Sequence, residues 1–109
     1  MPKAMQYTKG SIIYFEGDHD ERIFIMQQGA VLLTSTDIES GQPVAEQVKS
    51  GEFFGVKSAL GHFRREETAT ALVPTVAVAL TIQEFEILFS NNKALIMKML
   101  RVFSNQLRQ

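Results

Sequence analysis

The chain has 109 residues, a formal net charge of −1, 45% hydrophobic and 21% charged residues, which fits one small globular domain over residues 1–109. Its Lys and Arg residues are scattered, which argues against a nucleic-acid surface, and the absence of cysteine excludes disulfides and thiolate metal sites. The start has no apolar signal-peptide core and no apolar run is long enough to span a membrane, so we expect a cytoplasmic protein without a membrane partner.

Residues 5–81 have the pattern of short β-strands. β-branched and apolar runs are separated by Gly, Asp, Ser or Pro clusters, which predicts an antiparallel sandwich or barrel. The polar, glycine-containing segment Asp37–Gln42 is expected to form an exposed hairpin turn. The predicted strands are residues 11–16, 22–27, 30–36, 43–49, 68–73 and 76–81.

Residues 82–109 have helical periodicity. Thr81 is placed to cap a helix with Glu84 in its first turn, and the polar run 90–92 ends it. A second helix is predicted from about Lys93 to the end, with an apolar face that either packs on its own barrel or forms a homodimer contact. The pattern has no stop signal at the last residue, so either a further segment such as an output domain is missing or the polypeptide ends there naturally. The apolar face is made of Ile96, Met99, Leu100, Phe103 and Leu107.

The most informative segment is residues 51–60, GEFFGVKSAL, with Thr68-Ala69-Thr70 following after a polar loop. Two glycines frame an aromatic pair and lead into a short helix-forming run. The chain is therefore expected to turn tightly and present free backbone N–H groups at a helix start. That arrangement suits an anion such as a phosphate.

This segment resembles the phosphate-binding cassette of cyclic nucleotide-binding domains, F-G-E-[LIV]-A-L followed by R-[ST]-A-T. The order of glycines from Gly10 through Gly17 to Gly29 is similar to the family's opening pattern, so the resemblance covers nearly the whole chain. It implies an antiparallel β-roll (jelly roll) of about eight strands with a short cassette helix and two C-terminal helices. It further implies a regulatory domain that binds a cyclic nucleotide, cAMP or cGMP, and relays binding through these helices to an output domain or protein partner.

The resemblance also implies a ligand site, but two positions depart from the motif. Val56 stands where the family glutamate holds the ribose 2′-hydroxyl, and Glu67 stands where the family arginine pairs with the phosphate. Losing these contacts costs roughly 1.5–3 kcal/mol each, and a carboxylate repels the phosphate. The candidate ligand-binding residues are Phe54, Gly55, Val56, Lys57, Ser58, Ala59, Arg64, Arg65, Glu67, Thr68 and Ala69.

Several of these residues have two interpretations. Counting from Gly55 without a gap places Arg65 at the arginine position, so Arg64 or Arg65 either reaches the phosphate or lies in a solvated loop. Lys57 is either solvent-facing or a replacement cation, and Ser58 either donates to an anion or caps the helix. The Thr68 hydroxyl falls where relatives contact a phosphate or purine.

The sequence favours binding over catalysis. His19 and His62 belong to polar loops, and no P-loop or nucleophile elbow is present, so we expect neither an enzyme nor a metal site. Two functions follow. The first is a regulatory domain that binds a cyclic nucleotide or related anionic ligand. The second is a degenerate domain that no longer binds cyclic nucleotides and serves as a protein interaction or dimerisation module.

Overall fold

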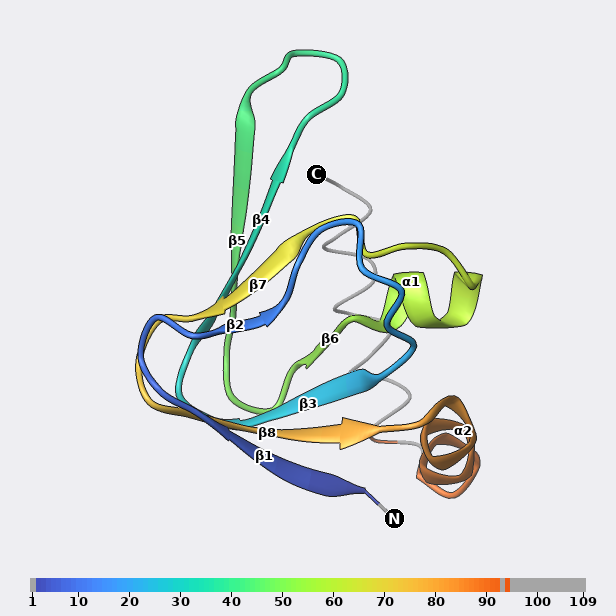
Figure 1. The fold of residues 1–109 in the computed structure, drawn as a ribbon. Helices are drawn as coiled ribbons and strands as arrows, with labels where there is room; N and C mark the ends of the chain where they lie inside the picture. Colours follow the sequence, from blue (N-terminus) through green and yellow to red (C-terminus); the bar gives the residue numbers. More distant parts are fainter. Residues whose placement is uncertain (1, 93, 95–109) are drawn as a thin grey trace.

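The computed structural model describes residues 2–92 and 94, which fold into two antiparallel sheets followed by a helix (Figure 1). One sheet has the strand order β1-β8-β3-β6 and the other β2-β7-β4-β5. The predicted eight-stranded antiparallel β-roll with a cassette helix is confirmed. The elements are β1 Lys3–Tyr7, β2 Ile12–Tyr14, β3 Ile23–Gln28, β4 Val31–Thr36, β5 Pro43–Val48, β6 Phe53–Phe54, α1 Val56–Gly61, β7 Thr68–Ala71, β8 Thr75–Leu80 and α2 Ile82–Ser90.

Strands β1 and β6 are not among the strands predicted from the residue pattern. The apolar and polar residues of β1 alternate only weakly, and most of them are exposed. The segment becomes a strand because it pairs with β8, from Lys3↔Ala79 to Tyr7↔Thr75. β6 has only two residues, Phe53 and Phe54, which pair with β3. Both strands depend on a partner distant in sequence, which local propensity does not reveal.

The β4–β5 hairpin closes through the predicted polar turn and extends beyond the rest of the roll (Figure 1). Asp37 N donates to Gln42 O at 2.9 Å, and Gly41 N donates to Asp37 O at 2.8 Å. This turn fixes the register Thr36↔Pro43, and the pairing continues to Val31↔Val48. Ile38, at the tip, is 98% exposed.

The two phenylalanines of β6 point into different apolar clusters. Phe54 stacks on Phe24 with ring centroids 4.9 Å apart and lies near Tyr14, inside the β-roll. Phe53 faces the opposite way and meets Phe85 of α2 edge-on at 5.7 Å. Strand alternation therefore makes β6 the link between the interior of the roll and α2.

Helix α2 begins as predicted. Thr81 Oγ1 accepts from Glu84 N at 3.1 Å, and Glu84 Oε1 accepts from Thr81 N at 2.9 Å, which is a complete capping box. The helix ends at Ser90, in agreement with the predicted break. The second C-terminal helix and its proposed dimer contact fall outside the described residues. Among the described residues, no helix is long and apolar enough to cross a membrane.

Candidate functional site

The cassette turn is built around Gly55, which precedes α1 with φ of 75°. A Cβ at this position would lie 2.5 Å from Arg65 Nη1. Glycine is therefore required twice, once for the left-handed backbone and once for the close approach of a guanidinium. Val56, Ser58 and Ala59 of α1 are buried behind the turn.

Arg65 is the buried cation of the cassette, with 0% of its side chain exposed. Its Nη1 donates to Gly55 O at 2.7 Å and to Ser58 Oγ at 2.8 Å, and its Nη2 donates to Arg22 O at 2.6 Å. The guanidinium carbon lies 4.1 Å from the ring centroid of Tyr14. A planar fork of donors satisfies all these partners from one position, which an ammonium group cannot do.

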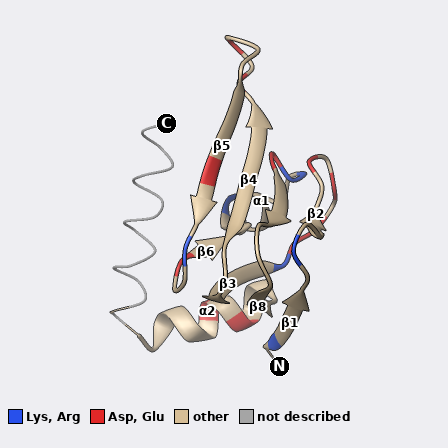
Figure 2. Cartoon of the chain, turned by 90° about the vertical axis from the view of Figure 1, so that its left-hand side faces the viewer, with Lys and Arg blue, Asp and Glu red and all other residues tan. Residues whose placement is uncertain are grey.

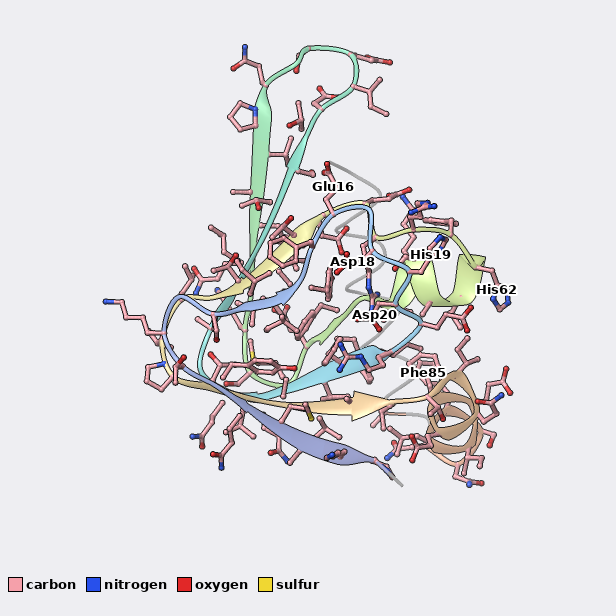
Figure 3. All side chains as sticks on the ribbon, viewed as in Figure 1. Glu16, Asp18, His19, Asp20, His62 and Phe85 are labelled. Carbon is pink, nitrogen blue, oxygen red and sulfur yellow. The ribbon has the colours of Figure 1, made fainter. Side chains whose placement is uncertain are left out.

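Asp20 is the carboxylate that neutralises Arg65. Its Oδ1 lies 3.3 Å from Arg65 Nη2, and both oxygens accept from Arg22, at 3.0 and 2.9 Å. Burial alone would raise the pKa of Asp20, but the hydrogen bonds from Arg22 and the charge of Arg65 lower it. Figure 3 places Asp20 on the loop before β3, beside α1, so this loop and the cassette are joined through Arg65.

The interpretation of Arg65 as a solvated loop residue is wrong. The alignment anchored on Thr68-Ala69-Thr70, which puts Glu67 at the family's phosphate position, stays a prediction. Counting from Gly55 singled out Arg65, and its side chain reaches the cassette turn. The buried acceptors of the turn explain why the side chain folds inward. Arg64 is exposed and donates to Gly17 O at 3.1 Å, so the surface interpretation holds for that residue.

The other candidate residues are placed around this turn with local partners. Lys57 is exposed and pairs with Glu66 at 3.2 Å. Ser58 does not cap the helix, because the N-cap is Gly55 and the Ser58 hydroxyl accepts from Arg65. The Thr68 hydroxyl accepts from Glu16 N at 3.0 Å and ties β7 to the loop after β2, while Ala69 is buried in the roll.

A cavity of about 1240 Å³ lies between the cassette and the β4–β5 hairpin. Its apolar lining comes from Leu33, Ile38, Val44, Phe53, Phe54 and Val56. Its charged lining is mainly acidic, and Lys57 is the one cation among the described lining residues. Figure 2 shows acidic positions along the hairpin and the loops beside it. The carboxylates that line the cavity are Glu16, Asp37, Glu39, Glu46, Glu66 and Glu67.

Two of these carboxylates, Glu46 and Glu67, lie on the inner side of the roll. Glu46 is not among the candidate residues named from the sequence. Glu46 is directly opposite the buried Leu33, so both side chains share the inner face of the sheet. Glu67 accepts from the buried Tyr14 hydroxyl at 2.7 Å. Burial and the negative charge of Glu67 raise the pKa of the Tyr14 hydroxyl. The Glu46 position follows from the predicted hairpin turn, because that turn sets the register.

Glu46 is expected to reduce stability at neutral pH. Burial raises the pKa of its carboxyl group, and the charges of Glu52 and Glu67 raise it further. The folded state therefore disfavours the ionised form, a penalty that is absent below the unfolded pKa near about 4.3 and grows as pH rises through the raised folded pKa. Glu46→Gln should raise the urea midpoint at pH 7 but not at pH 4, whereas the hairpin control Glu39→Gln should change neither. An equal gain at both pH values would contradict this assignment.

Comparison with known proteins agrees with this geometry. The sequence pattern of the cyclic nucleotide-binding domain family matches residues 4–92. The global nitrogen regulator of Nostoc sp. is 28% identical over 99% of this chain, which spans about half (49%) of that relative's length.

The fold is shared with solved structures, two of which are compared with this chain. The catabolite activator protein of Thermus thermophilus is 24% identical, with a TM-score of 0.79 over 98% of this chain and 50% of its own. A regulatory subunit of a cAMP-independent protein kinase A from Trypanosoma cruzi, solved with guanosine bound, is 21% identical, with a TM-score of 0.69 over 79% of this chain and 31% of its own. The family pattern covers most of the sequence, and the β-roll, the cassette turn and the adjoining cavity are all present. The chain belongs to the cyclic nucleotide-binding domain family.

Proposed function

We propose that this chain is a regulatory domain that binds a small molecule in the cavity beside the cassette and acts without catalysis. The observation that carries the proposal is the cavity itself, which opens onto the cassette turn and has apolar walls with several polar groups. Binding domains of this family are regulatory modules. This chain spans about half the length of the Nostoc and Thermus relatives. We infer that the output it controls belongs to another domain or to a protein partner.

A cyclic nucleotide is disfavoured as the natural ligand by the charges around the cassette. Arg65 is fully buried and paired with Asp20, so an anion has to displace that carboxylate to reach it. Glu67 lines the cavity where relatives offer an arginine, and Val56 offers no acceptor to a ribose hydroxyl. An anionic ligand that exchanges with Asp20 at Arg65 is the remaining route to the anion-binding function predicted from the sequence.

Occupancy of the cavity has a short physical path to the C-terminal helices. Phe53 lines the cavity and also contacts Phe85 edge-on at 5.7 Å and Phe89 at 6.3 Å. Because Phe53 belongs to both surroundings, a shift of β6 on ligand binding would change the packing of α2. We infer that α2 is the first element to respond to the ligand, and that the predicted second helix passes the response on.

The second candidate function is a ligand-independent interaction module. It is favoured by the carboxylate at the family's phosphate position and by the exposed Ile38 at the end of the projecting hairpin. In this case the roll acts as a rigid scaffold, and the partner contacts its surface.

Chemical-shift mapping separates the two functions. Amide spectra of the full chain would be recorded with cAMP, cGMP, adenosine and guanosine in turn. The proposed function predicts saturable shifts at Val56, Lys57 and Glu67 with at least one probe, together with smaller shifts at Phe85. The absence of shifts with all four would contradict ligand binding and favour the interaction module.

A further inference from the structure

We propose that Asp20 is an autoinhibitory contact of the cassette: its carboxylate occupies Arg65 in the folded chain, excludes other oxyanions from it, and gives way by withdrawing to Arg22. This inference goes beyond the proposed function, because it concerns Arg65, which is not among the described residues that line the cavity. Ligand binding in the cavity and the role of Asp20 can therefore fail independently.

Two arginines share the Asp20 carboxylate, and Arg22 holds it by the shorter contacts. The Nε and Nη2 of Arg22 donate to the two oxygens at 3.0 and 2.9 Å, and its backbone N donates to Oδ1 at 3.0 Å. Arg65 Nη2 lies farther from Oδ1, at 3.3 Å. Charge-assisted bonds are strongest when they are short and bidentate, so the contact with Arg65 is the one that breaks at lower cost.

Arg65 has a donor that Asp20 does not use. The Arg65 side chain is fully buried, and among the described residues its Nε has no hydrogen-bond partner. A carboxylate that pairs fully with a guanidinium accepts two parallel N–H bonds, whereas Asp20 lies beside Nη2 alone. The two arginines and Asp20 also leave the cluster with one positive charge in excess. The unused Nε and this excess charge both point to an oxyanion that could replace Asp20.

Asp20 lies between Arg65 and solvent. The Tyr14 ring covers one face of the guanidinium, and Gly55 O and Ser58 Oγ accept from Nη1. The Asp20 side chain is 13% exposed, and Figure 3 places it on the loop before β3. An anion that replaced Asp20 at Arg65 would leave that carboxylate paired with Arg22, so the exchange strands no buried charge.

The contact also holds the cassette turn in place without a ligand. Nη1 of Arg65 joins the residue before α1, Gly55, to Ser58 within α1, and Nη2 faces the Asp20 loop. A change of anion at Nη2 therefore acts on both ends of the turn through one rigid guanidinium.

Rescue by a small carboxylate tests the inference. Asp20→Ala in the full chain would be unfolded with urea in sodium formate and in sodium chloride of equal ionic strength. We expect its midpoint to fall below that of the parent, and formate to restore roughly half of the loss or more in a saturable way. The parent should gain nothing, because Asp20 excludes formate. The matched control is Asp18→Ala on the same loop, whose Oδ2 accepts from Phe15 N, and it should not respond to formate.

The side-chain signal of Arg65 Nε assigns the rescue to this site, since Arg22 also loses its partner in Asp20→Ala. In a proton–nitrogen correlation spectrum, formate should shift this signal in Asp20→Ala and not in the parent. An unshifted signal in the folded variant, a rescue equal to that in chloride, or an equal response of the parent would overturn the inference.

Poor folding of Asp20→Ala would still give a result. Folding in formate but not in chloride is itself the expected rescue. If the variant folds in neither salt, Asp20→Asn replaces it, because the amide keeps an oxygen for Arg22 N but loses the charge. Formate should then displace the amide and shift the Arg65 Nε signal, and an unshifted signal would contradict the autoinhibitory role of Asp20.

Discussion

Arg65→Met is expected to lower the free energy of unfolding by about 3 kcal/mol or more, since breaking a buried ion pair by removing one partner typically costs 3–5 kcal/mol. The change leaves Asp20 without its buried cation and removes the donor from Gly55 O, Ser58 Oγ and Arg22 O. Urea unfolding followed by circular dichroism measures the loss. It should appear without any ligand, because the interactions are internal to the chain.

The matched control is Arg64→Met, which removes the same charge from an exposed side chain with one hydrogen bond to Gly17 O. Its effect should stay within about 0.5 kcal/mol. If Arg65→Met does not fold, Arg65→Lys is used instead. It keeps the positive charge but lacks the planar guanidinium, so its free energy of unfolding should fall by an intermediate amount. Equal unfolding midpoints for the Arg64 and Arg65 variants would contradict the structural role of Arg65.

Glu67→Arg combined with Val56→Glu is expected to create cyclic AMP binding at least about 100-fold tighter than that of the parent chain. The change removes a repulsive carboxylate, adds a guanidinium for the phosphate and adds an acceptor for the ribose hydroxyl, and hydrogen bonds to charged groups contribute about 1.5–3 kcal/mol each. Isothermal titration with cyclic AMP measures the gain. An unchanged affinity in a folded double variant would show that these positions do not face the phosphate.

Two controls keep this result interpretable. Glu86→Arg makes the same charge change on exposed α2 and should leave cyclic AMP binding as it is in the parent. Glu67→Arg also deprives the buried Tyr14 hydroxyl of its acceptor, so Tyr14→Phe is added to avoid an unsatisfied donor. Glu67→Arg with Tyr14→Phe alone should give part of the gain if Val56→Glu disturbs the apolar cluster around Phe53 and Phe85.

The fold was predictable because its local signals agree with one another. The Asp37–Gln42 turn, the Thr81–Glu84 capping box and the glycines of the tight turns each have a mechanism that acts within a few residues. β1 and β6 were missed because their pairing with β8 and β3 is decided by distant partners. Short strands of this kind carry too little periodicity to be recognised alone.

The backbone turn of the candidate site was predictable, but the side-chain contacts around it were not. The cassette turn at Gly55 and the groove position of Glu67 followed from the motif. The burial of Arg65 did not, because it depends on Asp20 and on the Arg22 carbonyl, which come from a separate loop. Glu46 was missed for a different reason: its inward direction required transferring the hairpin register onto β5, a step that the sequence permits.

The most direct test of ligand binding in the acidic cavity beside the cassette is a pair of titrations, guanosine and cyclic GMP, each at low and at high salt. Screening weakens charge interactions as the Debye length falls from about 10 Å at 0.1 M to about 3 Å at 1 M. We predict saturable guanosine binding that is insensitive to salt, and weaker cyclic GMP binding that improves with salt as repulsion is screened. Tighter binding of cyclic GMP that weakens with salt would contradict the account, because it would reveal attraction of the phosphate to a cation in the cassette.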